Sequence, residues 1–423
     1  MIMTEDFLHY LWKFRLAGER LWSVTGEELV VLSPGEHNPD AGPDFLNARI
    51  VLGGTTWAGN VEIHVRSSDW RRHRHEKDPA YDNIILHAVY EHDLELQRKN
   101  GETIPTLLMK DFCESEAYDT YNHFLNNHLW VPCANHLQEV RKVVINDWLA
   151  SLSVARLERK CTELNKLLEY NSGDWQQSFF EALSSTLGFR INKLPFEQVA
   201  RQTPIQHLLR HKDQLFQVEA MLFGQAGLLE GRYHDDYPKK LKKEYLHLKN
   251  KFSLEPVPGH LWKFLRIRPN NFPTIRLAQM AMLLHLHSNL VGEILDTPDP
   301  DQLRAIFALG VSDYWRSHYY FDRPSNAHGK SMSASTIDLI MINNVIPFLF
   351  LYGELKNKPV LKEKAVNLLE EIMPETNSVT RGFAMFGIRA ESAANSQALL
   401  ELKSSFCDQK KCLQCRIGLE LIR

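Results

Sequence analysis

Two carboxylates and one imidazole early in the sequence have the types and spacing of a divalent-metal site. Glu62 and His64 lie two residues apart in a strand-like stretch, so their side chains point to the same face. Asp44 opens the neighbouring strand of a predicted hairpin, from which its carboxylate can converge on that pair. Two carboxylates and a nitrogen base suit Mg²⁺ or Mn²⁺, which activates a bound water and neutralises phosphate charge. We therefore predict a phosphodiesterase site, with Asp44 and Glu62 as metal ligands and His64 orienting or deprotonating the water.

The same residues also have a structural explanation, which the sequence leaves open. An aspartate that follows a proline at a strand entry is often a turn residue. A Glu-x-His pair on an edge strand is often only its solvated face. An excess of histidines and acids in the surrounding stretch favours the metal site: His37, His64, His73, His75, His87 and His92, with Glu36, Asp40, Asp44, Glu62 and Asp78.

A basic loop follows the Glu-x-His pair and carries one interleaved aromatic residue, Trp70. Local positive charge with an aromatic side chain is the footprint of a surface that positions a backbone phosphate. We predict that substrate is contacted by Arg71, His73, Arg74 and His75. Two alternatives stay open: the loop is a solvated charged surface, or His73 and His75 bind Zn²⁺ or Mn²⁺, with His87 within reach on the next strand.

Three cysteines near the C-terminus have the spacing of metal ligands, Cys407-x4-Cys412-x2-Cys415. Such a set needs a fourth ligand, and Cys133, just before the helical region, is the best candidate. Four thiolates suit a structural Zn²⁺ or an iron–sulfur cluster. This ligation would tie the two ends of the helical region together. The alternative is a reduced tail without metal, and the two remaining cysteines are expected in the core or at the surface.

Composition and charge limit the class of protein. The chain has 423 residues, 44% hydrophobic, and a formal net charge of −3, which predicts two globular domains and excludes a strongly basic nucleic-acid binder. Nucleic-acid binding would therefore need a local patch. The N-terminus lacks the apolar core of a signal peptide, and the most apolar stretches are broken by polar residues. We predict a cytoplasmic protein without a membrane partner or disulfides, of undetermined oligomeric state.

The elements that must position these residues change character along the chain. A helix is predicted over residues 4–17, followed by strands over 28–32, 45–52, 57–66, 83–90 and 104–109. The Gly53-Gly54 pair predicts the turn of a hairpin between the second and third of these strands. From residue 111 onward helical periodicity dominates, and the last helix is predicted over residues 380–406. The predicted fold is α+β, with a small mixed-sheet domain over residues 1–125 and a large all-α domain over 126–423.

The N-terminal pattern resembles the PD-(D/E)XK, or restriction-endonuclease-like, nuclease fold. The resemblance covers about the first hundred residues: Pro43-Asp44 at one strand, Glu62-Ile63-His64 on the next, and an αβββαβ order. It departs where the family has a lysine, because His64 stands there. Very-short-patch repair endonucleases are similar in fold and use histidines that follow a tryptophan, as in Trp70 to His75. This resemblance implies a metal-dependent nuclease.

Over nearly its whole length the sequence resembles the bacterial family of domain of unknown function 2851. The resemblance is carried by Gly42-Pro43-Asp44-Phe45, Val61-Glu62-Ile63-His64, Asp69-Trp70, His73-Arg74-His75, Arg268-Pro269, Asn271-Phe272-Pro273 and the three terminal cysteines. It implies a bacterial cytoplasmic protein and specifies no activity. The cysteine arrangement is also similar to the clasp of iron–sulfur-containing nucleases of CRISPR adaptation and recombination. In those proteins, however, the clasp brackets the nuclease core.

Three functions follow from the sequence. The leading hypothesis is a metal-dependent phosphodiesterase that acts on DNA or RNA. The first alternative is a non-catalytic nucleic-acid-binding or scaffolding protein with a nuclease-like fold, since the expected lysine is missing. The second alternative is a hydrolase with a His-rich transition-metal site.

Overall fold

The computed structural model describes residues 3–16, 21–113, 116–327 and 329–422. The chain divides into two compact units, the first formed by Met1–Trp148 with Leu402–Arg423 and the second by Leu149–Glu401. Compactness does not report which segments fold independently, so the predicted domain boundary between residues 125 and 126 stays a prediction.

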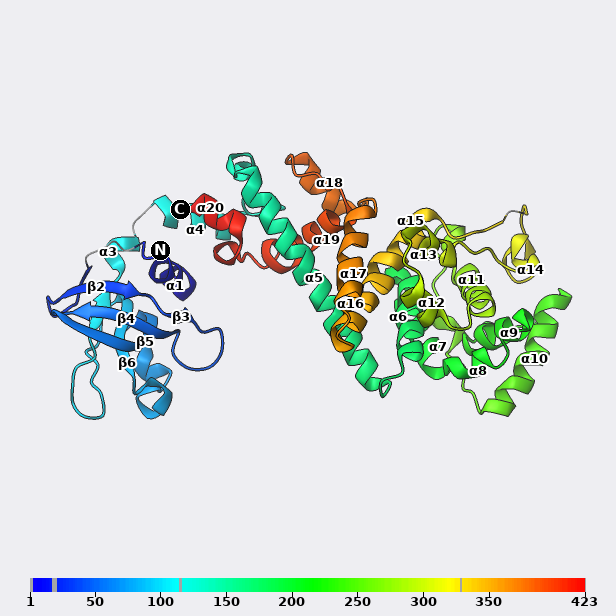
Figure 1. The fold of residues 1–423 in the computed structure, drawn as a ribbon, viewed down its shortest axis with the longest axis horizontal. Coiled ribbons are helices and arrows are strands. Elements are labelled where there is room, and N and C mark those ends of the chain that lie inside the picture. The colour runs from blue at the N-terminus through cyan, green and yellow to red at the C-terminus, as the bar shows by residue number, and fades with distance from the viewer. Residues whose placement is uncertain (1–2, 17–20, 114–115, 328, 423) are drawn as a thin grey trace. The chain divides into compact units, whose positions relative to one another are not determined.

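A mixed sheet forms the centre of the first unit (Figure 1), in the strand order β1-β2-β4-β5-β6-β7 with β3 beside β4. The strands are β1 (Leu21–Trp22), β2 (Glu28–Ser33), β3 (Glu36–His37), β4 (Phe45–Leu52), β5 (Thr55–Arg66), β6 (Ile84–Glu91) and β7 (Thr106–Leu108). Pairing is antiparallel from β1 to β5, whereas β6 runs parallel to both β5 and β7. The predicted α+β class, with a mixed sheet followed by many helices, is confirmed.

The hairpin of β4 and β5 carries the predicted carboxylates. Its two-residue turn contains Gly53 and Gly54, with φ of +55° and +82°, so the predicted glycine turn is confirmed. Consecutive positive φ angles match the twist of the flanking strands and favour glycine. At the far end of the hairpin Phe45 pairs with Val61. This register brings the residue before β4 next to the middle of β5.

The crossover from β5 to β6 carries the predicted substrate-binding loop. Parallel strands need such a connection because their ends lie at opposite edges of the sheet. Here it consists of α2 (Asp69–Arg72) and two 3₁₀ turns, η1 (His75–Lys77) and η2 (Pro79–Tyr81). In the parallel register Glu62 lies opposite His87. The sheet and its crossover therefore gather residues from three segments.

Helices complete the first unit. They are α1 (Glu5–Lys13), α3 (Lys110–Cys113), α4 (Glu116–Asn126), η3 (Ala134–Glu139), the start of α5 (Lys142–Tyr170), the π-helical turn η7 (Leu402–Cys407), η8 (Cys412–Gln414) and α20 (Arg416–Ile422). The first helix, predicted over residues 4–17, ends at Lys13, and residue 17 lies outside the described residues. Phe7, Leu8 and Leu11 of α1 are buried, which gives this helix one apolar face toward the core.

The second unit is almost entirely helical. It contains the rest of α5, α6 (Trp175–Leu187), α7 (Phe189–Gln202), α8 (Ile205–Leu209), α9 (Leu215–Gln225), α10 (Asp236–Phe252), η4 (Gly259–Leu261), η5 (Pro269–Asn271), α11 (Pro273–Leu286), α12 (Leu290–Asp296), α13 (Pro300–Phe307), α14 (Asp313–Arg316), β8 (His318–Tyr320), β9 (Arg323–Pro324), α15 (Ala334–Ile340), the π-helical turn η6 (Met341–Val345), α16 (Ile346–Leu355), α17 (Pro359–Glu371), α18 (Ser378–Met385) and α19 (Ala393–Glu401). One large apolar cluster joins these helices.

The most apolar helix of the chain lies in this unit. The continuous helical segment Ala334–Leu355 is long and apolar enough to cross a membrane by length and composition. Within its most apolar window 67% of the residues are buried inside the structure, as in the core helix of a folded domain.

One predicted helix is wrong. The sequence pattern over 380–406 predicts a single helix, but the structure has α18, α19 and the π-helical turn η7 in this region. Gly387 has a φ of +87° shortly after α18, a conformation that ends a helix and that glycine adopts without strain. The apolar periodicity continues across this break, so periodicity alone could not locate it.

Candidate functional site

Asp44 and Glu62 are held together by backbone hydrogen bonds. The Asp44 N–H donates to Glu62 Oε2 at 3.2 Å, and the Ile63 N–H donates to Asp44 Oδ2 at 2.8 Å. Asp44 is partly exposed, whereas Glu62 is buried. The structure therefore brings the two predicted carboxylates to one place and fixes their orientation before any ligand binds.

Imidazoles surround the buried carboxylate. Glu62 Oε1 lies 3.5 Å from His64 Nε2 and 3.2 Å from His75 Nε2. On its other side, His64 Nδ1 lies 2.8 Å from His87 Nε2. His64 Nε2 is also 3.2 Å from Nδ1 of His73, so one ring links the strands to the crossover loop.

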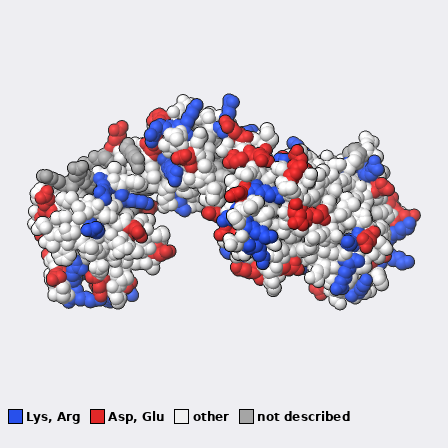
Figure 2. Space-filling model, viewed as in Figure 1, with Lys and Arg blue, Asp and Glu red and all other residues white. Residues whose placement is uncertain are grey.

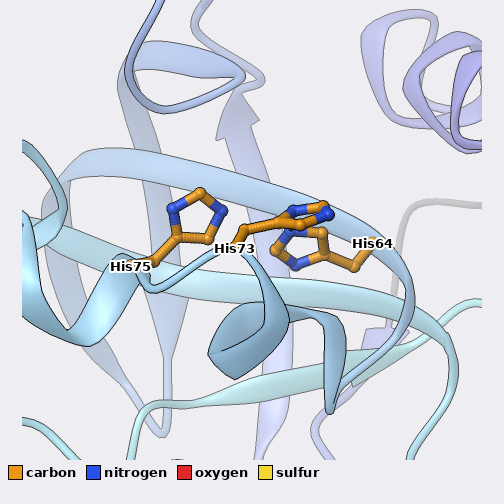
Figure 3. A group of neighbouring side chains, drawn as sticks. All are labelled: His64, His73 and His75. Atoms are coloured by element: carbon orange, nitrogen blue, oxygen red, sulfur yellow. Dashed lines mark hydrogen bonds between the residues drawn. The ribbon is translucent and has the colours of Figure 1, made fainter.

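Three of these histidines could hold a metal ion. Figure 3 shows His64, His73 and His75 gathered on one side of the sheet, and one ring nitrogen of each lies within 4.8 Å of the others. Imidazole nitrogens with a carboxylate oxygen are the donor set that Zn²⁺ and related transition metals prefer. With Glu62 as a fourth donor, the residues fit such an ion as well as they fit Mg²⁺ or Mn²⁺ at the two carboxylates.

The cluster opens into a strongly acidic pocket of about 420 Å³. Its carboxylates come from the first helix, the loop before β4, β5 and the crossover. The lining residues are Glu5, Asp40, Ala41, Gly42, Asp44, Glu62, Ile63, His64, His73, His75, Asp78 and Tyr81. This set contains five acidic residues and neither lysine nor arginine. A cation is therefore favoured in the pocket, and a free anion is not.

The predicted substrate-binding residues fall into two groups. His73 and His75 line the pocket, whereas Arg71 and Arg74 are exposed and lie outside its lining. Arg74 has a φ of +64°, a left-handed conformation that redirects the chain between the two histidines. The arginines thus sit on the same loop as the pocket histidines without contributing to the pocket wall.

Burial controls the charge of the inner groups. Burial, and next the neighbouring His87, lower the pKa of His64 to about 2. Burial likewise lowers the pKa of His87 to about 3. For Glu62 burial raises the pKa, although the contact with His75 acts against it. Both inner rings are therefore neutral near pH 7 and have lone pairs available for a cation.

The structure adds three residues that the sequence did not point to. His9 Nε2 lies 3.2 Å from Asp44 Oδ2, and although burial lowers the pKa of His9, Asp44 raises it above its ordinary value. Glu5 lines the pocket, and the Tyr81 ring stacks on His75 with centroids 3.9 Å apart. A signal was present for two of them: Glu5 and His9 are four residues apart on one face of α1.

The four predicted cysteine ligands belong to the same unit. Cys133 directly precedes η3, Cys407 ends η7, Cys412 begins η8 and Cys415 follows it. All six cysteines of the chain are free thiols in the structure, and Cys113 and Cys161, which the sequence placed either in the core or at the surface, are buried. The cysteine set does not line the acidic pocket.

Residues 5–378 match the family described as "Protein of unknown function (DUF2851)", so the chain belongs to this family. The match covers most of the chain, including the whole acidic pocket and its histidines. Comparison with curated proteins and with solved structures gave no match.

Proposed function

We propose that this member of the family is a metal-dependent phosphodiesterase that acts on DNA or RNA. The observation that carries the proposal is the meeting of Asp44, Glu62 and His64 at one acidic pocket, braced by direct hydrogen bonds. A bound Mg²⁺ or Mn²⁺ would supply an activated water and neutralise charge on a phosphate.

The electrostatics of the pocket support a metal-dependent reaction. Five carboxylates line it without a cationic side chain of lysine or arginine, so a phosphate group would be repelled from the protein alone. Asp44 and Glu62 would hold the cation. His64, kept neutral and oriented by His87, would orient the attacking water, because a pKa of about 2 makes this ring too weak a base to take its proton.

The loop that follows β5 supports a phosphate contact at the rim. His73 is exposed although its Nδ1 reaches His64, so its ring borders both the site and solvent. Arg71 and Arg74 on the same loop would contact phosphates outside the pocket. On the face in view, Figure 2 shows acidic and basic side chains interspersed over much of the surface.

The order of elements also supports a nuclease-like site. α1, the antiparallel β2, β4 and β5, the crossover with α2, and the parallel β6 follow the αβββαβ order of the restriction-endonuclease-like fold. Asp44 precedes β4, and Glu62 and His64 lie on β5, where that family has its motif residues. The buried neutral His64 cannot supply the positive charge of the usual lysine, so the bound cation and the rim must supply it.

Cleavage assays with matched variants test the proposal. Plasmid, single-stranded DNA and RNA are incubated with the full chain in Mg²⁺ or Mn²⁺, beside Asp44→Asn and Glu62→Gln. Glu91→Gln is the control, because Glu91 pairs with Arg66 at the surface, away from the pocket. We expect cleavage by the wild type and the control only. Equal cleavage by all four proteins would remove the assignment.

A second candidate function is favoured by the three histidines. Their nitrogens are close enough to share one ion, which suits a transition-metal hydrolase better than a Mg²⁺ enzyme. Metal analysis of the purified chain separates the two functions. Zinc or iron that is lost in His73→Ala and His75→Ala, but kept in His92→Ala, would favour this candidate.

The non-catalytic alternative has its own signature in the same assays. Nucleic acid that binds without metal and without cleavage, equally in wild type and Glu62→Gln, would favour a binding or scaffolding role.

The cytoplasmic location and the absence of a membrane partner also stay predictions.

A further inference from the structure

We propose that Cys133, Cys407, Cys412 and Cys415 form a second metal site, a four-thiolate centre for zinc or an iron–sulfur cluster, that fastens the C-terminal segment from residue 402 to the rest of the first unit. The proposal is independent of the pocket function, because it uses other residues and other elements.

The fold brings the four cysteines together from distant parts of the chain. η8, which begins at Cys412, contacts α1, α4 and η7, and α20 packs against both α4 and η3. Electrostatic interactions connect every pair of the four sulfurs. Lys410 adds a further tie, because its ammonium donates to the carbonyl oxygens of Leu125 and Asn127. The thiols therefore form one cluster rather than two separate pairs.

Two backbone donors point at the sulfur of Cys415. Burial raises the pKa of this thiol, and the hydrogen bonds that its sulfur accepts from the backbone N–H groups of Gly418 and Ile417 act against that rise. A side chain at Gly418 would not fit, because its Cβ would lie 2.2 Å from the Cys412 carbonyl oxygen. Backbone donors aimed at a sulfur stabilise its charged form, the form that binds metal.

A buried donor without a regular partner points to the same site. The indole N–H of Trp148 is buried and has no oxygen or nitrogen acceptor within the described part of the chain. It is directed at the sulfur of Cys415, where burial raises the pKa of the thiol and this donor acts against the rise. A buried N–H without a strong acceptor is costly, and a charged sulfur at this site would supply one.

The cysteines need a cation to be charged. Burial raises the pKa of all four thiols, that of Cys412 to about 12, although Lys410 acts against this rise. Buried thiols lose their protons when a bound metal ion compensates the negative charge of the thiolates. The free energy of metal binding then contributes to the free energy of folding. Lys403 and Lys410 would offset part of the remaining negative charge.

The donor set fits two kinds of metal centre. Four cysteine thiolates bind either a structural zinc ion or an iron–sulfur cluster. The metal that the purified protein contains distinguishes the two.

Metal analysis of the full chain tests the assignment directly. The protein is purified without oxygen, and iron, acid-labile sulfide and zinc are measured with the visible spectrum. We expect either zinc, or iron and sulfide with broad visible absorbance, and in both cases this metal is lost in Cys412→Ser and Cys415→Ser. Cys113→Ser and Cys161→Ser are matched controls, since both residues are buried cysteines outside the set. No metal after reconstitution with zinc or with iron and sulfide, or a metal content that Cys412→Ser and Cys415→Ser keep in full, would overturn the proposal.

A second measurement covers variants that fail to fold. In the wild type, the bound metal is removed by oxidation and chelation, and cleavage of residues 402–423 by a protease is followed. We expect faster cleavage of this segment once the metal is removed. In Glu62→Gln we expect the cysteine-bound metal to be retained. A metal content that is unchanged in all four cysteine-to-serine variants would sink the cysteine assignment. Because these readouts do not involve cleavage of nucleic acid, they are independent of the proposed phosphodiesterase.

Discussion

The two candidate metal sites of the first unit differ in how their ligands are held. Asp44 and Glu62 are oriented by backbone hydrogen bonds across one hairpin, and His64 is braced by His87. The cysteines come from chain segments that meet only through the packing of η3, η8 and α20. The first site is therefore organised by the sheet itself, whereas the proposed cysteine site depends on packing between distant segments.

The sites also differ in access to solvent. The acidic pocket has a partly exposed Asp44 and an exposed His73 at its rim, so a substrate can reach a bound cation. Cys133, Cys412 and Cys415 are buried, and none of them lines the acidic pocket. An open site with oxygen and nitrogen donors suits catalysis, and a closed site with sulfur donors suits structure. The predictions below follow from this contrast.

The largest effect is expected from loss of the cysteine-bound metal. In Cys412→Ser, proteolytic cleavage after residue 401 should accelerate roughly 10-fold or more, since metal binding contributes directly to folding. The matched change at the open site, His73→Ala, should leave this rate unchanged. Limited proteolysis followed by mass spectrometry measures the cleavage rate of both variants. Equal acceleration in the two variants would contradict the proposed difference between the closed cysteine site and the open pocket.

Removal of one pocket carboxylate should abolish activity while the fold persists. Glu62→Gln keeps the shape of the side chain but removes a metal ligand, so we expect kcat to fall about 10²- to 10³-fold. Glu91→Gln is the surface control. Cleavage rates and circular dichroism of the three proteins provide the test. A loss of fold that matches the loss of rate would mean that Glu62 is structural.

A weaker effect is expected at the residue behind the metal ligands. His87 contacts His64 and has no exposed surface. His87→Asn should lower metal affinity in the pocket about 10- to 100-fold, as is usual for a group that orients a ligand. His92→Asn is the control, because His92 directly follows β6, the strand that carries His87. Calorimetric titration with Mn²⁺ measures the difference, and identical affinities would remove the orienting role.

Acid should destabilise the sheet through its buried histidines. In the folded protein the pKa values of His64 and His87 are about 2 and about 3, whereas in the unfolded chain both histidines have a pKa near 6.5. As the pH falls toward and below 6.5, the unfolded chain therefore binds protons at these two residues while the folded protein does not, which favours unfolding. Between about pH 7.5 and about pH 5.5 the free energy of unfolding should fall by roughly 1 to 3 kcal/mol. Glu62 opposes this trend, because its raised pKa stabilises the folded state as the pH falls. Hydrogen exchange in β5 and β6, corrected for intrinsic rates, should be less pH-dependent in His64→Gln.

The smallest effect is expected at the rim. Arg71 and Arg74 are exposed, so each would contribute one screened contact to a phosphate. Arg71→Ala should raise KM only about 2- to 5-fold. It should also reduce the slope of the logarithm of affinity against the logarithm of salt concentration by about one. Kinetics at two salt concentrations measure this change. A loss of kcat comparable to that of Glu62→Gln would place Arg71 inside the site instead.

Much of the candidate site could be predicted because its residues lie close in sequence or in a single hairpin. The alternation in β5 indicated that Glu62 and His64 share a face, and the glycine turn placed Asp44 on the neighbouring strand. The role of His9 could not be predicted, because the packing of α1 against β5 depends on the whole core. The break after Gly387 was missed for a similar reason: apolar spacing resumes beyond it, and only backbone geometry shows the turn.

The sequence by itself determined the chemical types available to this protein: carboxylates, imidazoles and thiols at spacings that permit metal binding. It also determined the hairpin, because a period of two and a pair of glycines act over a few residues. Only the tertiary structure decided that five carboxylates line one pocket without a lysine or arginine, and that Cys133 lies with the last three cysteines. These outcomes depend on long-range packing, whose energy is distributed over the buried core and is not encoded in any short segment.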